Sequence, residues 1–129
     1  MAIIVYNRTK EDHSAHPYNF PIYRGGSILG NPYTDKPVSK TMAVYQVKTR
    51  EEAIQRYGSY FDMQYGRNKE FTEVIDCIYE LYKQGETVYL ECYCDPLPCH
   101  GHIIVQKLQK RLLKEKIKEA KERRKHEMG

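Results

Sequence analysis

The sequence of 129 residues contains no tryptophan, three phenylalanines and four cysteines. No apolar run approaches the roughly 18 residues that a transmembrane helix needs. The apolar residues 3–6 are followed by a charge at Arg8, too soon for the hydrophobic core of a signal peptide. A membrane protein and a secreted, disulfide-held scaffold are therefore not expected, and the sequence favours a cytoplasmic location.

Tyrosine is the aromatic residue that the sequence does use, twelve times. Its ring suits half-buried surfaces and pocket walls, because the hydroxyl edge can stay in water. With 40% hydrophobic and 29% charged residues, the composition is that of a globular protein with a rather thin core. The length allows one such core, so we expect a single domain.

Positive charge is concentrated at the C-terminal end. Residues 107–127 contain ten basic residues and four glutamates, a net charge of +6, so the rest of the chain carries −2 of the overall +4. A protein that bound polyanions over its whole surface would not divide its charge in this way. We expect one α/β domain over residues 1–117, followed at residues 118–129 by a basic helical tail that projects into solvent or frays.

Four short segments have the composition of β-strands. They are rich in β-branched or alternating apolar residues and end at glycine, proline or charged residues. The predicted strands are residues 3–6, 20–23, 42–47 and 86–93. Residues 7–19 show no periodicity and are predicted to form a loop.

Two helices have recognisable ends. The first begins after Thr49, which forms a capping box with Glu52, and ends at Gly66. The second covers residues 71–82, where apolar residues recur at steps of three and four, and ends at Gly85.

A third helix is predicted from Cys99 or His100 onward, with an apolar face that continues to Ile117. Cys77 falls beside the apolar stripe of the second helix and is predicted to be a half-buried packing residue. The element order β-β-β-α-α-β-α indicates an α/β fold. We expect a small sheet of three to four strands, packed by two to three helices, with a long basic C-terminal helix.

Thiols and imidazoles gather where the last strand ends and the last helix begins: Cys92, Cys94, Cys99, His100 and His102. One interpretation is a zinc site held by Cys92, Cys94, Cys99 and His100. A second is catalysis, with Cys99 as a thiolate activated by the helix N-terminus, His100 as acid or base and His102 as a further proton carrier. A third is that these residues only pack and cap the turn.

A glycine-bearing loop at residues 23–32 is the other candidate site. Gly25 and Gly26 let backbone amides approach a ligand, and Arg24 can clamp a phosphate or carboxylate with two parallel hydrogen bonds. Asn31 precedes a proline. It can be a ligand contact, or equally well a structural corner whose side chain satisfies nearby backbone groups.

The two segments together resemble a small domain family of unknown function that is scattered through bacteriophages and bacteria. The resemblance lies in Y-R-G-G-S-I-L-G-N-P at residues 23–32, R-E-E-A at residues 50–53 and E-C-Y-C-D-P-L-P-C-H-G-H at residues 91–102. It covers about residues 20–110. Here two glycines separate Arg24 from the serine, and His102 stands where the family commonly has an aspartate.

The resemblance implies a compact α/β domain that handles a nucleotide or nucleoside, and it is consistent with a phage origin. The expected pocket lies between the loop of residues 24–32 and the turn of residues 94–102, with Tyr23, Tyr33 or Tyr93 stacking on the ligand. The expected ligand-binding residues are Arg24, Gly25, Gly26, Ser27, Asn31 and Gly101. If the protein is an enzyme, it acts on such a ligand through Cys99 and His100.

The alternative is a non-enzymatic, metal-stabilised phage accessory protein that binds nucleic acid or a host protein. Its binding surface would be the basic helix over residues 107–125, whose side chains can contact phosphates. Because glutamates are interspersed among these lysines, a solvated helix with internal ion pairs also explains the segment.

Overall fold

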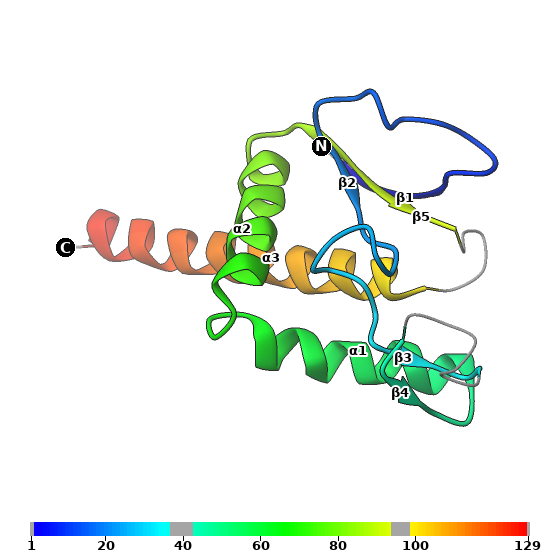
Figure 1. Cartoon of the computed structure of the whole chain (residues 1–129). Coiled ribbons are helices and arrows are strands. Elements are labelled where there is room, and N and C mark those ends of the chain that lie inside the picture. The colour runs from blue at the N-terminus through cyan, green and yellow to red at the C-terminus, as the bar shows by residue number, and fades with distance from the viewer. Residues whose placement is uncertain (1, 37–42, 94–98, 129) are drawn as a thin grey trace.

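The computed structural model describes residues 2–36, 43–93 and 99–128 (Figure 1). It has the expected mixed α/β fold, with three helices and two small sheets. In chain order the elements are β1 Ala2–Asn7, β2 Asn19–Pro21, β3 Tyr33–Thr34, β4 Tyr45–Gln46, α1 Arg50–Gln64, α2 Lys69–Lys83, β5 Thr87–Cys92 and α3 His100–Met128.

The main sheet has the order β1-β5-β2, and both pairings are parallel. Val5 pairs with Leu90 on one side of β5, and Phe20 pairs with the same Leu90 on the other. The segments predicted as strands at residues 3–6, 20–23 and 86–93 all contribute to this sheet. Because the strands are parallel, their carboxyl ends meet at one edge, which in open α/β folds borders the ligand crevice.

A second sheet pairs β3 with β4, also in parallel. Of the strand predicted at residues 42–47, Tyr45 and Gln46 form β4 among the residues that the structure describes. The partner strand β3 was not predicted, since two residues are too few to show alternation.

Helix α1 begins at the predicted Thr49 cap, but the reciprocal bond of the box goes to Lys48, one residue before the cap. Thr49 Oγ1 accepts a hydrogen bond from the Glu52 amide at 3.1 Å, and Glu52 Oε2 accepts one from the Lys48 amide at 3.1 Å. Beyond the helix, Gly66 adopts a φ of +88°, the left-handed conformation that lets the chain leave α1. The chain then turns directly into α2.

Helix α2 buries the predicted apolar stripe and ends before Gly85, which has a φ of +91°. Its N-cap is Asn68, whose Oδ1 accepts a hydrogen bond from the Phe71 amide at 3.1 Å. The prediction that Cys77 is half-buried is wrong, because this residue is exposed. It follows the buried Ile75 by two residues, about 200° around the helix, and so faces solvent.

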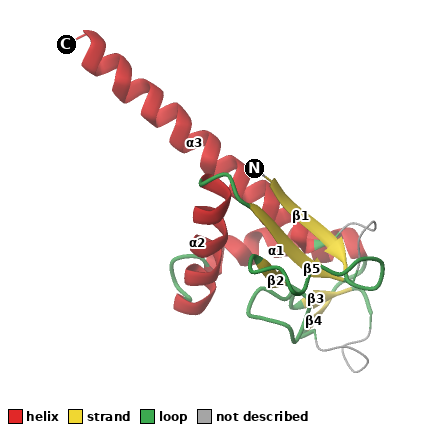
Figure 2. Ribbon diagram, turned by 90° about the horizontal axis from the view of Figure 1, so that it is seen from above, coloured by secondary structure: helices red, strands yellow, loops and turns green. Residues whose placement is uncertain are grey.

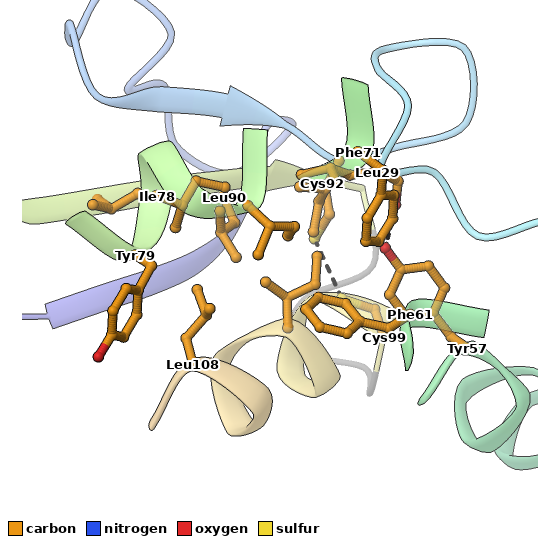
Figure 3. Close-up of a cluster of buried hydrophobic side chains, with 14 of the residues drawn as sticks. Leu29, Tyr57, Phe61, Phe71, Ile78, Tyr79, Leu90, Cys92, Cys99 and Leu108 are labelled. Atoms are coloured by element: carbon orange, nitrogen blue, oxygen red, sulfur yellow. Dashed lines mark hydrogen bonds between the residues drawn. The ribbon is translucent and has the colours of Figure 1, made fainter. Parts of the chain in front are cut away.

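The core lies between the main sheet and the three helices (Figure 3). Leu90 of β5 and Ile78 of α2 lie on one side of this core, and Leu108 of α3 closes it from another side. Full burial of each such side chain stabilises the fold by about 1.5–3 kcal/mol. The buried apolar residues of the core are Ile22, Leu29, Tyr57, Phe61, Phe71, Ile75, Ile78, Tyr79, Val88, Leu90, Cys92, Cys99, Ile104, Leu108 and Leu112.

The loop of residues 7–19 covers the opposite face of the sheet. Its His13 ring stacks on Tyr89 of β5, with centroids 4.1 Å apart. Below the loop, Glu91 Oε1 accepts hydrogen bonds from Asn19 Nδ2 at 3.0 Å and from Tyr6 Oη at 3.3 Å. Burial, together with the Glu91 carboxylate, raises the pKa of Tyr6 to about 12. This face of the sheet is therefore covered, and the carboxyl edge of the strands remains as a binding region.

Helix α3 is one continuous helix of 29 residues. Its first part packs in the core through Ile104, Leu108 and Leu112, and its second part extends beyond the body of the molecule (Figure 2). The helix continues to Met128. Over the described residues, no helix combines the length and the apolar character needed to cross a membrane.

Candidate functional site

A cavity of about 480 Å³ opens at the carboxyl edge of the main sheet. This volume lies within the range of small-molecule sites. Its walls come from the segment after β2, from the start of α1, and from the junction of β5 with α3. The residues that line it are Tyr23, Arg24, Asn31, Thr34, Asp35, Lys36, Arg50, Ala53, Ile54, Cys92, Tyr93, Cys99 and His100. The two segments singled out in the sequence therefore contribute to one cavity.

Arg24 is on the cavity wall, and part of its guanidinium holds the loop together. Its Nε donates to the Asn31 carbonyl at 2.7 Å and its Nη2 donates to the Tyr33 carbonyl at 2.8 Å. At least two of the guanidinium donors that could bind a phosphate are thus engaged with the protein's own backbone.

Gly25, Gly26 and Ser27 shape the turn and do not line the cavity. Gly25 has a φ of +80°, and a Cβ on Gly26 would lie 2.7 Å from the Tyr23 ring. Ser27 Oγ donates to the Pro21 carbonyl at 2.5 Å. The structure gives these three residues a conformational role, and their predicted ligand contacts stay a prediction.

Asn31 is buried on the cavity wall, with its side chain bonded to backbone groups. Its Nδ2 donates to the Ala53 carbonyl at 3.1 Å, and its Oδ1 accepts from the Tyr33 amide at 3.0 Å. These bonds match the structural alternative that the sequence left open. They tie the loop to α1, so Asn31 positions one wall of the cavity against another.

The thiols of Cys92 and Cys99 lie side by side on the opposite wall, with their sulfur atoms 3.9 Å apart (Figure 3). The two residues are only 1% and 3% exposed. Cys99 Sγ also accepts a hydrogen bond from the Gly101 amide at 3.3 Å. Two thiolates bound to one tetrahedral zinc at about 2.3 Å would lie about 3.8 Å apart, so this spacing suits a metal.

No three histidine, cysteine or acidic side chains are grouped for metal binding within the described part of the chain. Cys94, the third predicted cysteine ligand, lies outside the described residues. The zinc site therefore stays a prediction.

His100 is buried at the first turn of α3, beside the thiols. Its Nε2 lies 2.7 Å from the Ile22 carbonyl oxygen, and its ring meets Tyr57 edge-on at 4.8 Å. Because a carbonyl only accepts, Nε2 carries the proton in this contact. This geometry fits the predicted acid or base role and equally fits a packing role.

His102 and Gly101 lie behind the cavity wall and do not line it. His102 Nδ1 accepts a hydrogen bond from the Cys99 amide at 3.2 Å, which helps to close the first turn of α3. A Cβ on Gly101 would lie 2.7 Å from Ile22 Cδ1 and 3.1 Å from Val5 Cγ1. Gly101 is thus a close-packing glycine whose amide donates to the Cys99 sulfur, and its predicted role in ligand binding stays a prediction.

Charge on the cavity wall is mainly positive. Arg24, Lys36 and Arg50 contribute cations, and Asp35 contributes a carboxylate. Arg50 and Lys36 were not predicted as site residues. Arg50 belongs to the R-E-E-A segment quoted for the family resemblance, but only the tertiary fold brings the start of α1 to the cavity.

Two of the three tyrosines proposed for stacking line the cavity. The rings of Tyr23 and Tyr93 meet edge-to-face, with centroids 5.0 Å apart. Tyr33 instead stacks on Tyr45 at 5.2 Å, in a neighbouring hollow of the surface.

Comparison with known proteins places the chain in a family, on the basis of one family model. Neither the curated proteins nor the solved structures gave a match. One family model matches residues 5–110, from β1 into α3, and so spans both walls of the cavity. The chain therefore belongs to the family described as Domain of unknown function (DUF4326).

Proposed function

We propose that the cavity at the carboxyl edge of the sheet binds a nucleotide- or nucleoside-type small molecule. The observation that carries this proposal is the joint contribution of the two segments to one cavity of about 480 Å³. Concave sites of this size with a few converging polar groups are the usual form of small-molecule sites.

The charge of the cavity favours an anionic ligand. Among the described lining residues, Arg24, Lys36 and Arg50 outnumber the carboxylate of Asp35. In a partly enclosed cavity the field of these cations is screened less than at an open surface. Guanidinium groups in particular match the geometry of phosphate oxygens.

The aromatic part of the wall favours a flat group next to that anion. Tyr93 is half exposed at the cavity and meets Tyr23 edge-to-face. Exposed tyrosine faces beside cations suit a heterocyclic base joined to a phosphate, because the base stacks while the phosphate pairs with the cations. A simple inorganic anion would use only one half of this wall.

A bound ligand would also lie against the thiol of Cys99 and the imidazole of His100. These are the groups that nucleophilic or acid–base chemistry would use. Cys99 immediately precedes α3, where the helix dipole favours a thiolate. Binding is the proposed function, and these two residues are where we expect any reaction to occur.

A thermal-shift panel of nucleotides and nucleosides tests the proposal. Ligand at 100 times its Kd adds about 2.7 kcal/mol of stability, which raises Tm by roughly 10 °C for a domain of this size. Arg50→Gln should weaken the binding about tenfold, since a hydrogen bond to a charged group contributes about 1.5–3 kcal/mol.

Arg56→Gln is the matched control, because Arg56 is also on α1 but lies outside this cavity and pairs with Glu52 at 3.2 Å. The Arg56→Gln variant should bind the ligand as tightly as the wild type does. A panel in which no member shifts Tm at millimolar concentration would refute the proposal.

A further inference from the structure

The continuity of α3 aligns a set of lysines that look scattered in the sequence. They recur at steps of four, four, three and four residues, which on an α-helix places them within an arc of about 80°. They span 15 residues, or about 22 Å along the helix axis. We call them the lysine stripe: Lys110, Lys114, Lys118, Lys121 and Lys125.

All five side chains of the lysine stripe are exposed, and among the described residues none of them forms an ion pair. Other cations of α3 are engaged with the body of the protein. Lys107 Nζ lies 2.8 Å from Asp62 Oδ2, and Arg111 Nη1 lies 2.9 Å from Asp76 Oδ1. The helix thus uses Lys107 and Arg111 for docking and presents the lysine stripe to solvent.

The glutamates of the same segment do not neutralise the stripe. Glu115, Glu119 and Glu122 also recur at steps of four and three, and the centre of their row lies about 100° around the helix from the centre of the lysine row, with Glu122 and Lys118 at the border between them. Glu115 is moreover paired with Lys83 of α2 at 3.1 Å. One edge of the projecting helix therefore carries five positive charges and no negative one.

We propose that the lysine stripe binds the phosphodiester backbone of nucleic acid. Over about 22 Å of duplex axis, one strand presents six or seven phosphates, which is enough to pair with five lysines. If α3 lay deep in the major groove, the neighbouring row of glutamates would face the second row of phosphates. We therefore expect the stripe to contact the phosphates at one edge of the groove, with binding independent of sequence.

A protein partner fits this surface less well. Protein interfaces are organised around a buried apolar or aromatic centre. Near the stripe the exposed large apolar side chains are Leu113 and Ile117, at 60% and 48% exposure, and neither lies within the lysine row. A row of cations without an apolar centre is typical of a surface that binds the phosphodiester backbone of nucleic acid.

Fluorescence anisotropy with a labelled 20-base-pair duplex between 50 and 200 mM salt tests this proposal. Five phosphate contacts predict a slope of log K against log salt of about −4.5, and about −3.5 for a single strand of the same sequence. The variant with Lys118→Ala and Lys121→Ala should lower affinity about tenfold or more at 50 mM salt and reduce the duplex slope by about 2.

The matched control replaces Lys116 and Arg123 with alanine. These two residues lie on the opposite face of α3, so this variant removes the same charge from the same helix. It should keep most of the affinity and the slope. Equal losses in the two variants, no binding at 50 mM salt, or tighter binding of polyglutamate than of the duplex would each overturn the proposal. Because the cavity is not involved, Arg50→Gln should leave duplex binding unchanged.

Discussion

Cys92 and Cys99 hold their sulfur atoms 3.9 Å apart in the wall of the cavity, nearly excluded from water. A disulfide would require about 2.05 Å, so the two residues are thiols in this structure. Cys77, on the outer face of α2, is exposed. The three described cysteines therefore differ in access, and their chemistry can be separated by reagents in solution.

Limited alkylation of the native protein should modify Cys77 first. Reactivity follows exposure and thiolate content, so we expect Cys77 to react about tenfold faster than Cys92 or Cys99. Peptide mass spectrometry over a time course follows each cysteine separately, so the rates of these three are measured apart from that of Cys94.

Preferential alkylation of Cys99 would instead identify it as an activated thiolate, as the catalytic interpretation requires. Elemental analysis of the same sample tests the zinc prediction. About one zinc per chain, lost on Cys92→Ser or Cys99→Ser, would support the metal site.

At the scale of elements, the junction of α1, α2 and α3 is held by a cluster around Arg111. Its Nη1 donates to Asp76 Oδ1 at 2.9 Å and to Tyr65 Oη at 3.1 Å, and its guanidinium lies 3.8 Å from the centroid of the Tyr79 ring. Burial alone would raise the pKa of Asp76. Hydrogen bonds from Tyr65 and Arg111 outweigh this, so the pKa lies below its usual value.

This lowered pKa predicts an acid-sensitive junction. The contribution of Asp76 to folding stability is present above its unfolded pKa of about 3.9 and is lost as the pH falls through the lower folded pKa. Because the Asp76 side chain is 43% exposed, we expect its contribution to the free energy of unfolding to be about 1 kcal/mol or less. Urea unfolding at pH 7 and pH 3 measures it.

Asp76→Asn serves as the comparison in that experiment. It should be less stable than the wild type at pH 7, and the difference should shrink toward pH 3, where the wild-type carboxyl is becoming protonated. A difference that stays constant with pH would show that the carboxylate charge is not what stabilises the junction.

At the scale of the whole molecule, α3 serves two regions. Its first turns bury Ile104 and Leu108 and border the cavity through His100, while residues 116–125 are exposed throughout. The family match ends at residue 110, near the point where α3 leaves the core. The body and the projecting part of the helix are thus separable in structure.

Deleting residues 118–129 should leave the body folded, with Tm within about 2 °C of the wild type, because removed exposed side chains contribute little to stability. Leu108→Ala is the contrast. This substitution leaves a cavity at a buried position. It should lower the free energy of unfolding by about 2–5 kcal/mol and Tm by roughly 10 °C or more. Circular dichroism melting measures both, and a large loss in the deletion would show that the segment supports the core.

Sequence patterns that depend on near neighbours predicted most of the elements. The three strands of the main sheet, the Thr49 cap and the ends at Gly66 and Gly85 follow from alternation, hydrogen-bonding side chains and backbone freedom within a few residues. The exposure of Cys77 was missed because a residue at the edge of an apolar helix stripe can point either toward the core or toward solvent.

The cavity depends on contacts between distant parts of the chain. The sequence pointed to Arg24 and Cys99, but that the Arg24 guanidinium is engaged with backbone carbonyls, and that Arg50 joins the same wall, follow from packing. In the same way, the sequence alone supplies the lysines of α3, whereas their alignment requires the unbroken helix. Local rules determine the elements, because each is decided within a few residues, but a binding surface is decided by which elements meet in space.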